Sequence, residues 1–97
     1  MSWSIDLKAD RNIPVRSVKT ALRAMGEMGA EPPRRGRPAA EQEWGWSCTV
    51  DVSRPRGRML PLSGAGFSKT EAEGFAESLA LQLRRLHLKI SVGRLRD

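Results

Sequence analysis

Hydrophobic and polar residues alternate along three stretches of the chain, 3–8, 44–52 and 88–92. An alternation with a period of two is typical of a strand that buries one face and exposes the other. A shorter stretch, 58–62, follows a tight basic turn and predicts a β-hairpin together with 44–52. Pro61 in this stretch predicts a bulge or an early end of the strand, because proline cannot donate a ladder hydrogen bond.

Two further segments repeat their hydrophobic residues every three or four positions, which predicts amphipathic helices. The first begins at Pro14 and ends before Gly29, with basic residues on its outer side. The second begins near Ser68, whose spacing to Glu71 matches a capping box. Three prolines and a glycine exclude regular structure from 31–40. The expected inward-facing residues of the helices are Val15, Val18, Leu22, Met25, Met28, Ala72, Phe75, Ala76, Leu79, Leu83 and Leu86.

The predicted order of elements is β-α-β-β-α-β in a single domain, 1–97. The simplest closed packing of this order is an α+β, ferredoxin-like fold, in which a four-stranded antiparallel sheet carries both helices on one face. In this arrangement 31–40 is a flexible basic proline-rich loop and 93–97 is a short basic tail. The core is expected to include Trp44, Trp46, Val50, Leu22, Phe75, Leu79 and Leu83.

The composition, with 39% hydrophobic and 29% charged residues, is that of one globular domain. No hydrophobic run approaches the ~18 residues of a membrane span, and the first residues lack the pattern of a secretory signal. Cys48 has no second cysteine as a disulfide partner, and with one histidine, His87, the usual zinc cages cannot form. We therefore expect a cytoplasmic protein that uses no metal or other cofactor.

Candidates for catalytic chemistry are few. Cys48 lies among the hydrophobic positions of its strand, which favours an inert buried thiol, and its only possible base is His87. His87 itself follows the second helix, where a capping role is favoured. Glu71, Glu73 and Glu77 fall in the first turns of that helix, where carboxylates complement the helix dipole. The chain is therefore not expected to be an enzyme.

The stretch 63–70 has some features of a phosphate-binding loop, because it follows a strand, opens a helix and ends in Lys69-Thr70. Ser63 and Ser68 replace the two glycines that such a loop requires, which argues against nucleotide hydrolysis. Free N–H groups at the start of the helix, with Lys69 beside them, still suit one backbone phosphate. The alternative interpretation is a turn followed by a helix cap.

Positive charge is concentrated in two short segments. The chain has 17 lysines and arginines against 11 aspartates and glutamates, a formal net charge of +6. Without six clustered arginines, 11 basic residues would balance 11 acidic ones. Such clusters indicate either a partner with negative charge or solvated loops whose charge maintains solubility. The six arginines are Arg34, Arg35 and Arg37 in the proline-rich loop, and Arg54, Arg56 and Arg58 around the hairpin turn.

Residues 33–38 resemble an AT-hook, whose core R-G-R-P is matched by Arg35-Gly36-Arg37-Pro38. Residues 55–58 are a weaker second copy, because Met59 stands where the hook has proline. The resemblance covers about six of the 97 residues, and the lysines that usually flank such hooks are absent. It implies DNA binding in which the core arginines enter the narrow minor groove of A·T-rich duplexes, where the negative potential is enhanced.

The sequence thus predicts a small basic nucleic-acid-binding protein that contacts the backbone or minor groove through arginine-rich loops. DNA is favoured over RNA, because the 56–60 segment lacks the aromatic residues of RNA-recognition domains. In the predicted topology the 31–40 loop lies beside the start of the second helix, and the hairpin turn lies at the opposite end. The first of these two surfaces, expected to bind more strongly, contains Arg34, Arg35, Gly36, Arg37 and Lys69, and the second contains Arg54, Arg56 and Arg58.

A protein-interaction module is the alternative. The same arginine clusters suit a small regulator or inhibitor that binds the acidic surface of another protein. The edge strands of the predicted sheet would also allow pairing with a second copy in a homodimer. Competition by generic duplex DNA at fixed salt distinguishes these functions.

Overall fold

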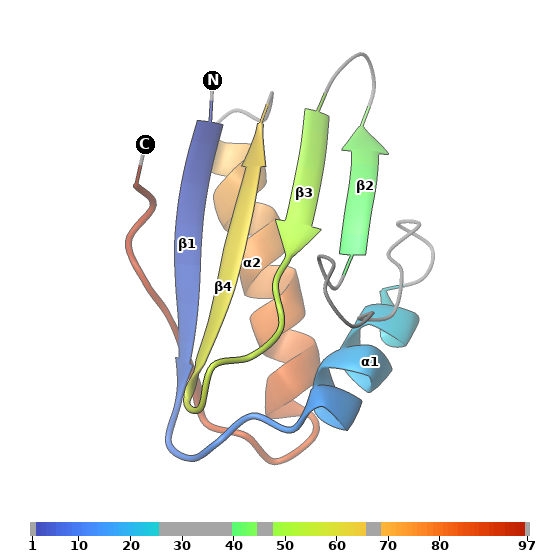
Figure 1. The fold of residues 1–97 in the computed structure, drawn as a ribbon, viewed down its shortest axis with the longest axis vertical. Coiled ribbons are helices and arrows are strands. Elements are labelled where there is room, and N and C mark those ends of the chain that lie inside the picture. Colours follow the sequence, from blue (N-terminus) through green and yellow to red (C-terminus); the bar gives the residue numbers. More distant parts are fainter. Residues whose placement is uncertain (1, 26–39, 45–47, 66–68, 97) are drawn as a thin grey trace.

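The computed structural model describes residues 2–25, 40–44, 48–65 and 69–96. Within these residues, five strands form one sheet in the order β2-β3-β4-β1-β5, and every neighbouring pair is antiparallel (Figure 1). Two helices complete the α+β fold: α1 (Val15–Ala24) and α2 (Lys69–Arg84). The strands are β1 (Ser2–Ala9), β2 (Ala40–Trp44), β3 (Cys48–Val52), β4 (Met59–Ala65) and β5 (Ile90–Val92).

The predicted four-stranded ferredoxin-like sheet is wrong. The stretch 44–52, predicted as one strand, contains the end of β2 and the whole of β3, which pair antiparallel from Trp44 opposite Cys48 to Ala40 opposite Val52. The chain therefore reverses direction within this stretch, and β2 becomes an additional strand at one edge of the described sheet. Alternation of hydrophobic and polar residues did not reveal the reversal, because its period of two is the same in both strand directions.

Pro61 neither ends β4 nor introduces a bulge. β4 pairs with β1 in one unbroken register from Met59 to Ala65. The N–H of Ser53, the residue after β3, donates to the carbonyl of Pro61 at 3.1 Å. The proline nitrogen therefore faces the side on which β3 has already ended, so the two strands keep all of their ladder hydrogen bonds.

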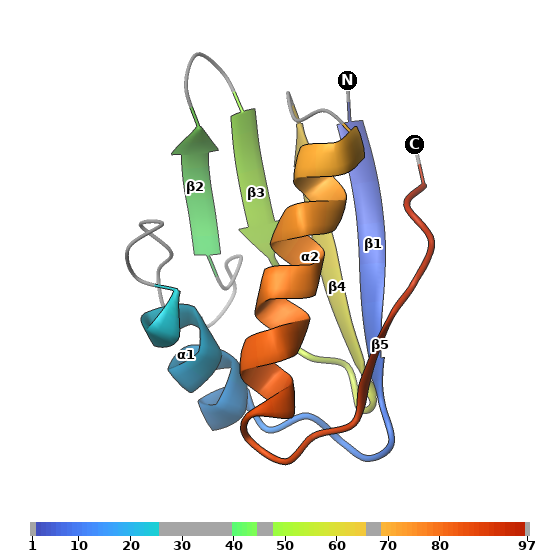
Figure 2. The ribbon, with the colours of Figure 1, turned by 180° about the vertical axis from the view of Figure 1, so that it is seen from behind.

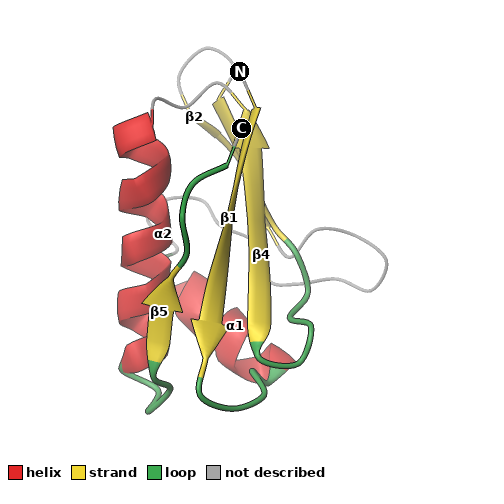
Figure 3. Cartoon of the chain, turned by 90° about the vertical axis from the view of Figure 1, so that its left-hand side faces the viewer, coloured by secondary structure: helices red, strands yellow, loops and turns green. Residues whose placement is uncertain are grey.

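The side of the sheet that faces the helices is hydrophobic. In β1, Trp3, Ile5 and Leu7 are buried, and their partners in β4 continue this face, with Leu62 opposite Ile5 and Leu60 opposite Leu7. α2 lies along this face, and α1 packs beside the end of α2 (Figures 2 and 3). The helices contribute Val18, Ala21, Leu22, Met25, Ala72, Phe75, Ala76, Leu79, Ala80 and Leu83 to one core cluster.

The sequence prediction of the core is confirmed for four helical residues, Leu22, Phe75, Leu79 and Leu83, which are each at most 4% exposed. Full burial of a side chain of this size contributes about 1.5–3 kcal/mol relative to exposure. The side chains of Trp44, Cys48 and Val50, and the whole of Trp46, lie outside the described part of the structure. Residues 26–28, the predicted end of the first helix, also lie outside it.

The C-terminal segment follows β1 beyond the end of β5, after a bulge that begins at Gly93. Val92 pairs with Leu7, whereas Arg96 pairs with Ser4, so this segment has one residue more than β1 between the two pairs. An extra residue in one strand moves the following side chains to the opposite face of the sheet.

The bulge decides where the last side chains point. It turns Leu95 against the core and brings the guanidinium of Arg96 to the carboxylate of Asp6 at 2.8 Å. A Cβ atom at Gly93 would lie 2.7 Å from the carbonyl oxygen of Asp6, so glycine alone allows this close approach. The predicted basic tail, 93–97, therefore lies along β1 as far as Arg96.

α2 ends in a Schellman motif that uses His87. The N–H of His87 donates to the carbonyl of Arg84 at 3.0 Å, and the N–H of Leu88 donates to the carbonyl of Leu83 at 3.4 Å. His87 has a φ of 67° in the left-handed region, at a position that glycine usually occupies. Its main chain thus caps the helix, while its side chain is exposed.

Candidate nucleic-acid interface

Three connections between elements meet at one end of the molecule, the lower end in Figure 1: β1 to α1 (10–14), β3 to β4 (53–58) and α2 to β5 (85–89). Each contributes exposed basic side chains. We call this surface the basic end and define it as Arg11, Arg54, Arg56, Arg58, Arg85 and Lys89.

Main-chain hydrogen bonds hold the three connections together. The N–H of Ile13 donates to the carbonyl of Gly57, and that of Ala9 donates to the carbonyl of Arg58, both at 2.8 Å. The N–H of Asp10 donates to the carbonyl of Lys89 at 3.2 Å. These bonds do not involve the basic side chains, so the basic end can keep its shape while those side chains contact a ligand.

The turn between β3 and β4 presents two of the arginines. The main chains of Arg56 and Met59 exchange two hydrogen bonds, of 2.7 and 3.1 Å, around the two-residue loop Gly57-Arg58. Gly57 has a φ of 60°, as in a type II′ turn, which favours glycine at the first central position. Arg56 thus precedes the loop of a tight turn and Arg58 lies within that loop, and both are exposed.

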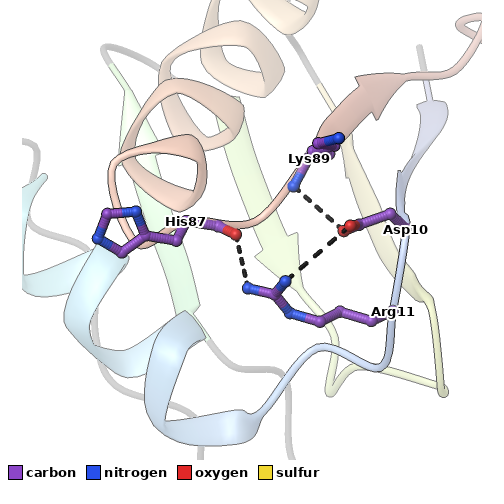
Figure 4. A network of polar contacts seen from close by, with 4 residues as sticks. All are labelled: Asp10, Arg11, His87 and Lys89. Atoms are coloured by element: carbon purple, nitrogen blue, oxygen red, sulfur yellow. Dashed lines mark hydrogen bonds and ion pairs between the residues drawn. The ribbon is translucent and has the colours of Figure 1, made fainter.

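A small polar network ties the first connection to the third (Figure 4). The guanidinium of Arg11 donates to the carbonyl of His87 and lies 4.0 Å from the carboxylate of Asp10. The other carboxylate oxygen of Asp10 accepts the N–H of Lys89 at 3.3 Å. Arg11 is therefore a positioning residue of the basic end, because its charge and its donors are already used within the protein.

The described basic residues differ in whether an acidic side chain neutralises them. Three arginines form ion pairs within the described residues: Arg11 with Asp10, Arg84 with Glu77 at 3.8 Å, and Arg96 with Asp6. Arg84 also donates two hydrogen bonds, of 3.1 and 3.0 Å, to the carbonyl of Ile90 on β5. Arg56, Arg58, Arg85 and Lys89 have no ion-pair partner in the described part of the chain.

A shallow depression of about 620 Å³ opens at the same end. Its charged lining residues are Lys8, Asp10, Arg84 and Lys89. Arg84 is already paired with Glu77 and Asp10 with Arg11, so Lys8 and Lys89 give the depression a net positive charge. The depression therefore favours anions over cations.

Of the sequence-predicted site residues, Arg54, Arg56 and Arg58 lie at the basic end. Lys69 is the first residue of α2, at the opposite end of the molecule (Figure 2). There it lines a second depression, of about 780 Å³, together with Glu73, Glu77 and Arg94. Opposite charges balance in this second depression. Arg34, Arg35, Gly36 and Arg37 lie outside the described residues.

Sequence reasoning missed Arg11, Arg85 and Lys89 as parts of the site. No local motif marks them, because they come from connections far apart in the chain. The usable signal was topological: in an antiparallel sheet the end of β1, the start of β5 and the turn before β4 meet at one end.

The described residues contain no group of three histidine, cysteine, aspartate or glutamate side chains arranged to hold a metal ion. No helix in the described ranges combines the length and the hydrophobicity of a membrane span. Comparison of the chain with protein-family models, curated proteins and solved structures finds no match.

Proposed function

We propose that the protein binds nucleic acid, with DNA favoured over RNA, through phosphate contacts made by the basic end. The observation that carries this proposal is the convergence of Arg56, Arg58, Arg85 and Lys89 on one surface without ion-pair partners in the described chain. Unpaired cations gathered on one surface create a positive potential that attracts a polyanion and supplies most of its binding energy.

The chemistry of the basic end suits phosphate. A guanidinium donates two parallel hydrogen bonds to phosphate oxygens, a geometry that an ammonium group cannot match. The type II′ turn holds the main chains of Arg56 and Arg58 in place, which lowers the ordering cost of binding. These contacts are with the backbone and carry no base preference of their own.

The AT-hook-like core supplies the second part of the proposal. Arg35 and Arg37 enter the minor groove of A·T-rich DNA, and the basic end adds affinity that is independent of base composition. The two contributions predict different effects of mutation, because only the first distinguishes A·T-rich from G·C-rich duplexes.

Fluorescence anisotropy titration with A·T-rich and G·C-rich duplexes, repeated at several salt concentrations, tests the proposal. R56Q/R58Q should weaken binding to both duplexes about tenfold. Its plot of log K against log salt should become less steep, by about 0.9 for each phosphate that is no longer neutralised. R35A/R37A should reduce the A·T preference. K69Q/R94Q removes the same charge at the opposite end and should bind within about twofold of the parent.

Two results would overturn this proposal. One is a parent protein that does not bind duplex DNA at about 0.15 M salt, which would favour the acidic surface of a protein as the partner. The other is a K69Q/R94Q variant whose affinity falls as far as that of R56Q/R58Q, since the basic end would then have no special role.

A further inference from the structure

We propose that α1 carries a second strip of phosphate contacts, formed by Arg16, Lys19 and Arg23, that continues the basic end, and that the ligand is therefore double-stranded. This inference rests on the proposed function and deepens it, because it defines the path of the ligand and its strandedness.

The three residues share one side of α1. At 3.6 residues per turn, positions 16, 19 and 23 fall within a sector of about 60°. The buried residues Val18, Ala21 and Leu22 occupy the opposite side, where they pack into the core. α1 contains no acidic residue, so the strip is uniformly positive.

The first turn of α1 is electrostatically unfavourable for the isolated helix. Arg16 lies in the first turn, where the helix dipole favours a carboxylate, and the N-cap residue Pro14 provides no side-chain cap. None of the three basic residues has an ion-pair partner in the ranges that the structure describes. Arg23 lies in the last turn and complements the helix dipole, but Arg16 and Lys19 bring the helix no such gain, and a polyanion on its surface would neutralise all three charges.

The strip adjoins the basic end. Ile13, just before the N-cap of α1, donates its N–H to the carbonyl of Gly57 at 2.8 Å, which places the start of the helix against the turn that carries Arg56 and Arg58. From there α1 leads away from that turn (Figure 1). At a rise of 1.5 Å per residue the strip is about 10 Å long, which corresponds to about three base-pair steps along the axis of a duplex at about 3.4 Å per step.

The part of the surface that the structure describes favours a duplex over a single strand. Proteins that bind single strands stack the bases on exposed aromatic rings. Among the side chains that the structure describes, the aromatic residues Trp3 and Phe75 are only 3% and 4% exposed. The large hydrophobic side chain exposed in this part of the chain, that of Leu81, is not aromatic. The described surface thus offers charges for a backbone and no platform for bases.

Three variants that each remove two positive charges test the strip: R16Q/R23Q, R56Q/R58Q and K69Q/R94Q. Each is titrated with a 20-base-pair duplex and with a 20-nucleotide oligo(dT) over a range of salt. R16Q/R23Q should bind the duplex about five- to tenfold more weakly than the parent. Its slope of log K against log salt should be less steep by up to about two units. K69Q/R94Q should bind as the parent does, and the parent should bind oligo(dT) at least about tenfold more weakly than duplex.

The variant R16K/R23K distinguishes a folding defect from the loss of phosphate contacts. It keeps both charges and should recover most of the duplex binding that R16Q/R23Q loses. If R16Q/R23Q binds like the parent while R56Q/R58Q is weakened, the strip is refuted and the proposed function stands. If the parent binds neither probe, both fail. Binding of oligo(dT) as tight as that of duplex would refute the double-stranded ligand.

Discussion

The two ends of the molecule carry their charge in different ways. At the basic end, exposed arginines and one lysine from three connections surround a single described carboxylate, that of Asp10. At the opposite end, Lys69 and Arg94 share a depression with Glu73 and Glu77, so charges of both signs are balanced. α2 shows the same contrast along its length, with glutamates in its first half and Arg84 in its last turn.

Main-chain hydrogen bonds hold both the basic end and the C-terminal segment, but side chains contribute more to the second. Besides the main-chain bonds of Gly93 to Asp6 and of Arg96 to Ser4, the C-terminal segment lies against β1 through the close approach at Gly93, the Arg96–Asp6 ion pair and the packing of Leu95 on the core. The shape of the basic end thus rests on its main chain, with side-chain support from Arg11 and Asp10. We expect mutations of its other side chains to affect binding more than stability, and mutations along the C-terminal segment to do the reverse.

The largest effect on stability is expected at Gly93. Gly93→Ala places a Cβ 2.7 Å from the carbonyl oxygen of Asp6 and should lower the free energy of unfolding by about 1–3 kcal/mol. In a domain of this size each kcal/mol corresponds to about 4–8 °C in Tm, which thermal unfolding followed by circular dichroism can measure. The affinity for duplex should not change.

Gly74→Ala is the matched control, because a Cβ at this position in α2 meets no atom within 4 Å. It should raise the free energy of unfolding by about 0.5–1 kcal/mol, since alanine is the better helix former. Equal effects of the two substitutions would contradict the close packing of the C-terminal segment against β1.

Gly57→Ala should affect both properties, because it disturbs the turn that presents Arg56 and Arg58. Its φ of 60° is strained for alanine, which predicts a loss of about 1–2 kcal/mol in unfolding free energy and a weaker complex with duplex. Gly57→Asn should be milder in both assays, since asparagine tolerates positive φ. If Gly57→Ala leaves duplex binding unchanged, the turn does not position the phosphate contacts.

Asp10→Asn should tighten duplex binding about two- to fivefold at low salt, which corresponds to about 0.4–1 kcal/mol. It removes a negative charge from the basic end but keeps an oxygen that can accept the N–H of Lys89. Asp6→Asn makes the same charge change beside Arg96 and should leave affinity unaltered while costing about 0.2–1 kcal/mol in stability. Anisotropy titration compares them, and equal gains in affinity would show that net charge alone decides binding.

The smallest effect is expected for His87→Gly. Glycine adopts a φ of 67° without strain, so this variant should gain about 0.5 kcal/mol in unfolding free energy, measured by urea denaturation. His87→Ala keeps the strain and is the control. A loss of stability in His87→Gly equal to that in His87→Ala would show that the imidazole itself stabilises the end of α2.

Local spacing predicted the features that depend on one element at a time. Trp3, Ile5 and Leu7 alternate in β1 as expected, and Leu22 and Phe75 are buried on the inner sides of their helices. These features follow from the periods of two and 3.6 residues, which relate each side chain to its own backbone. The basic turn around Gly57 was also predicted, because a glycine within a short polar segment marks a hairpin.

Periodicity thus identified most of the residues of β1, α1 and α2 that face the core, and the sequence also showed where arginines cluster along the chain. Val15 and Leu86, which were also expected to face inward, are only partly buried and do not belong to the core cluster. Three features emerge from the folded arrangement alone: β2 and β3 are separate strands, Gly93 approaches Asp6 closely, and Lys89 joins Arg58 at one end. Each of these depends on pairing between segments that are distant in sequence or that reverse direction, and periodicity records neither. Partner choice in a sheet is set by the packing of the whole core, so the candidate interface became visible only once the strands were placed side by side.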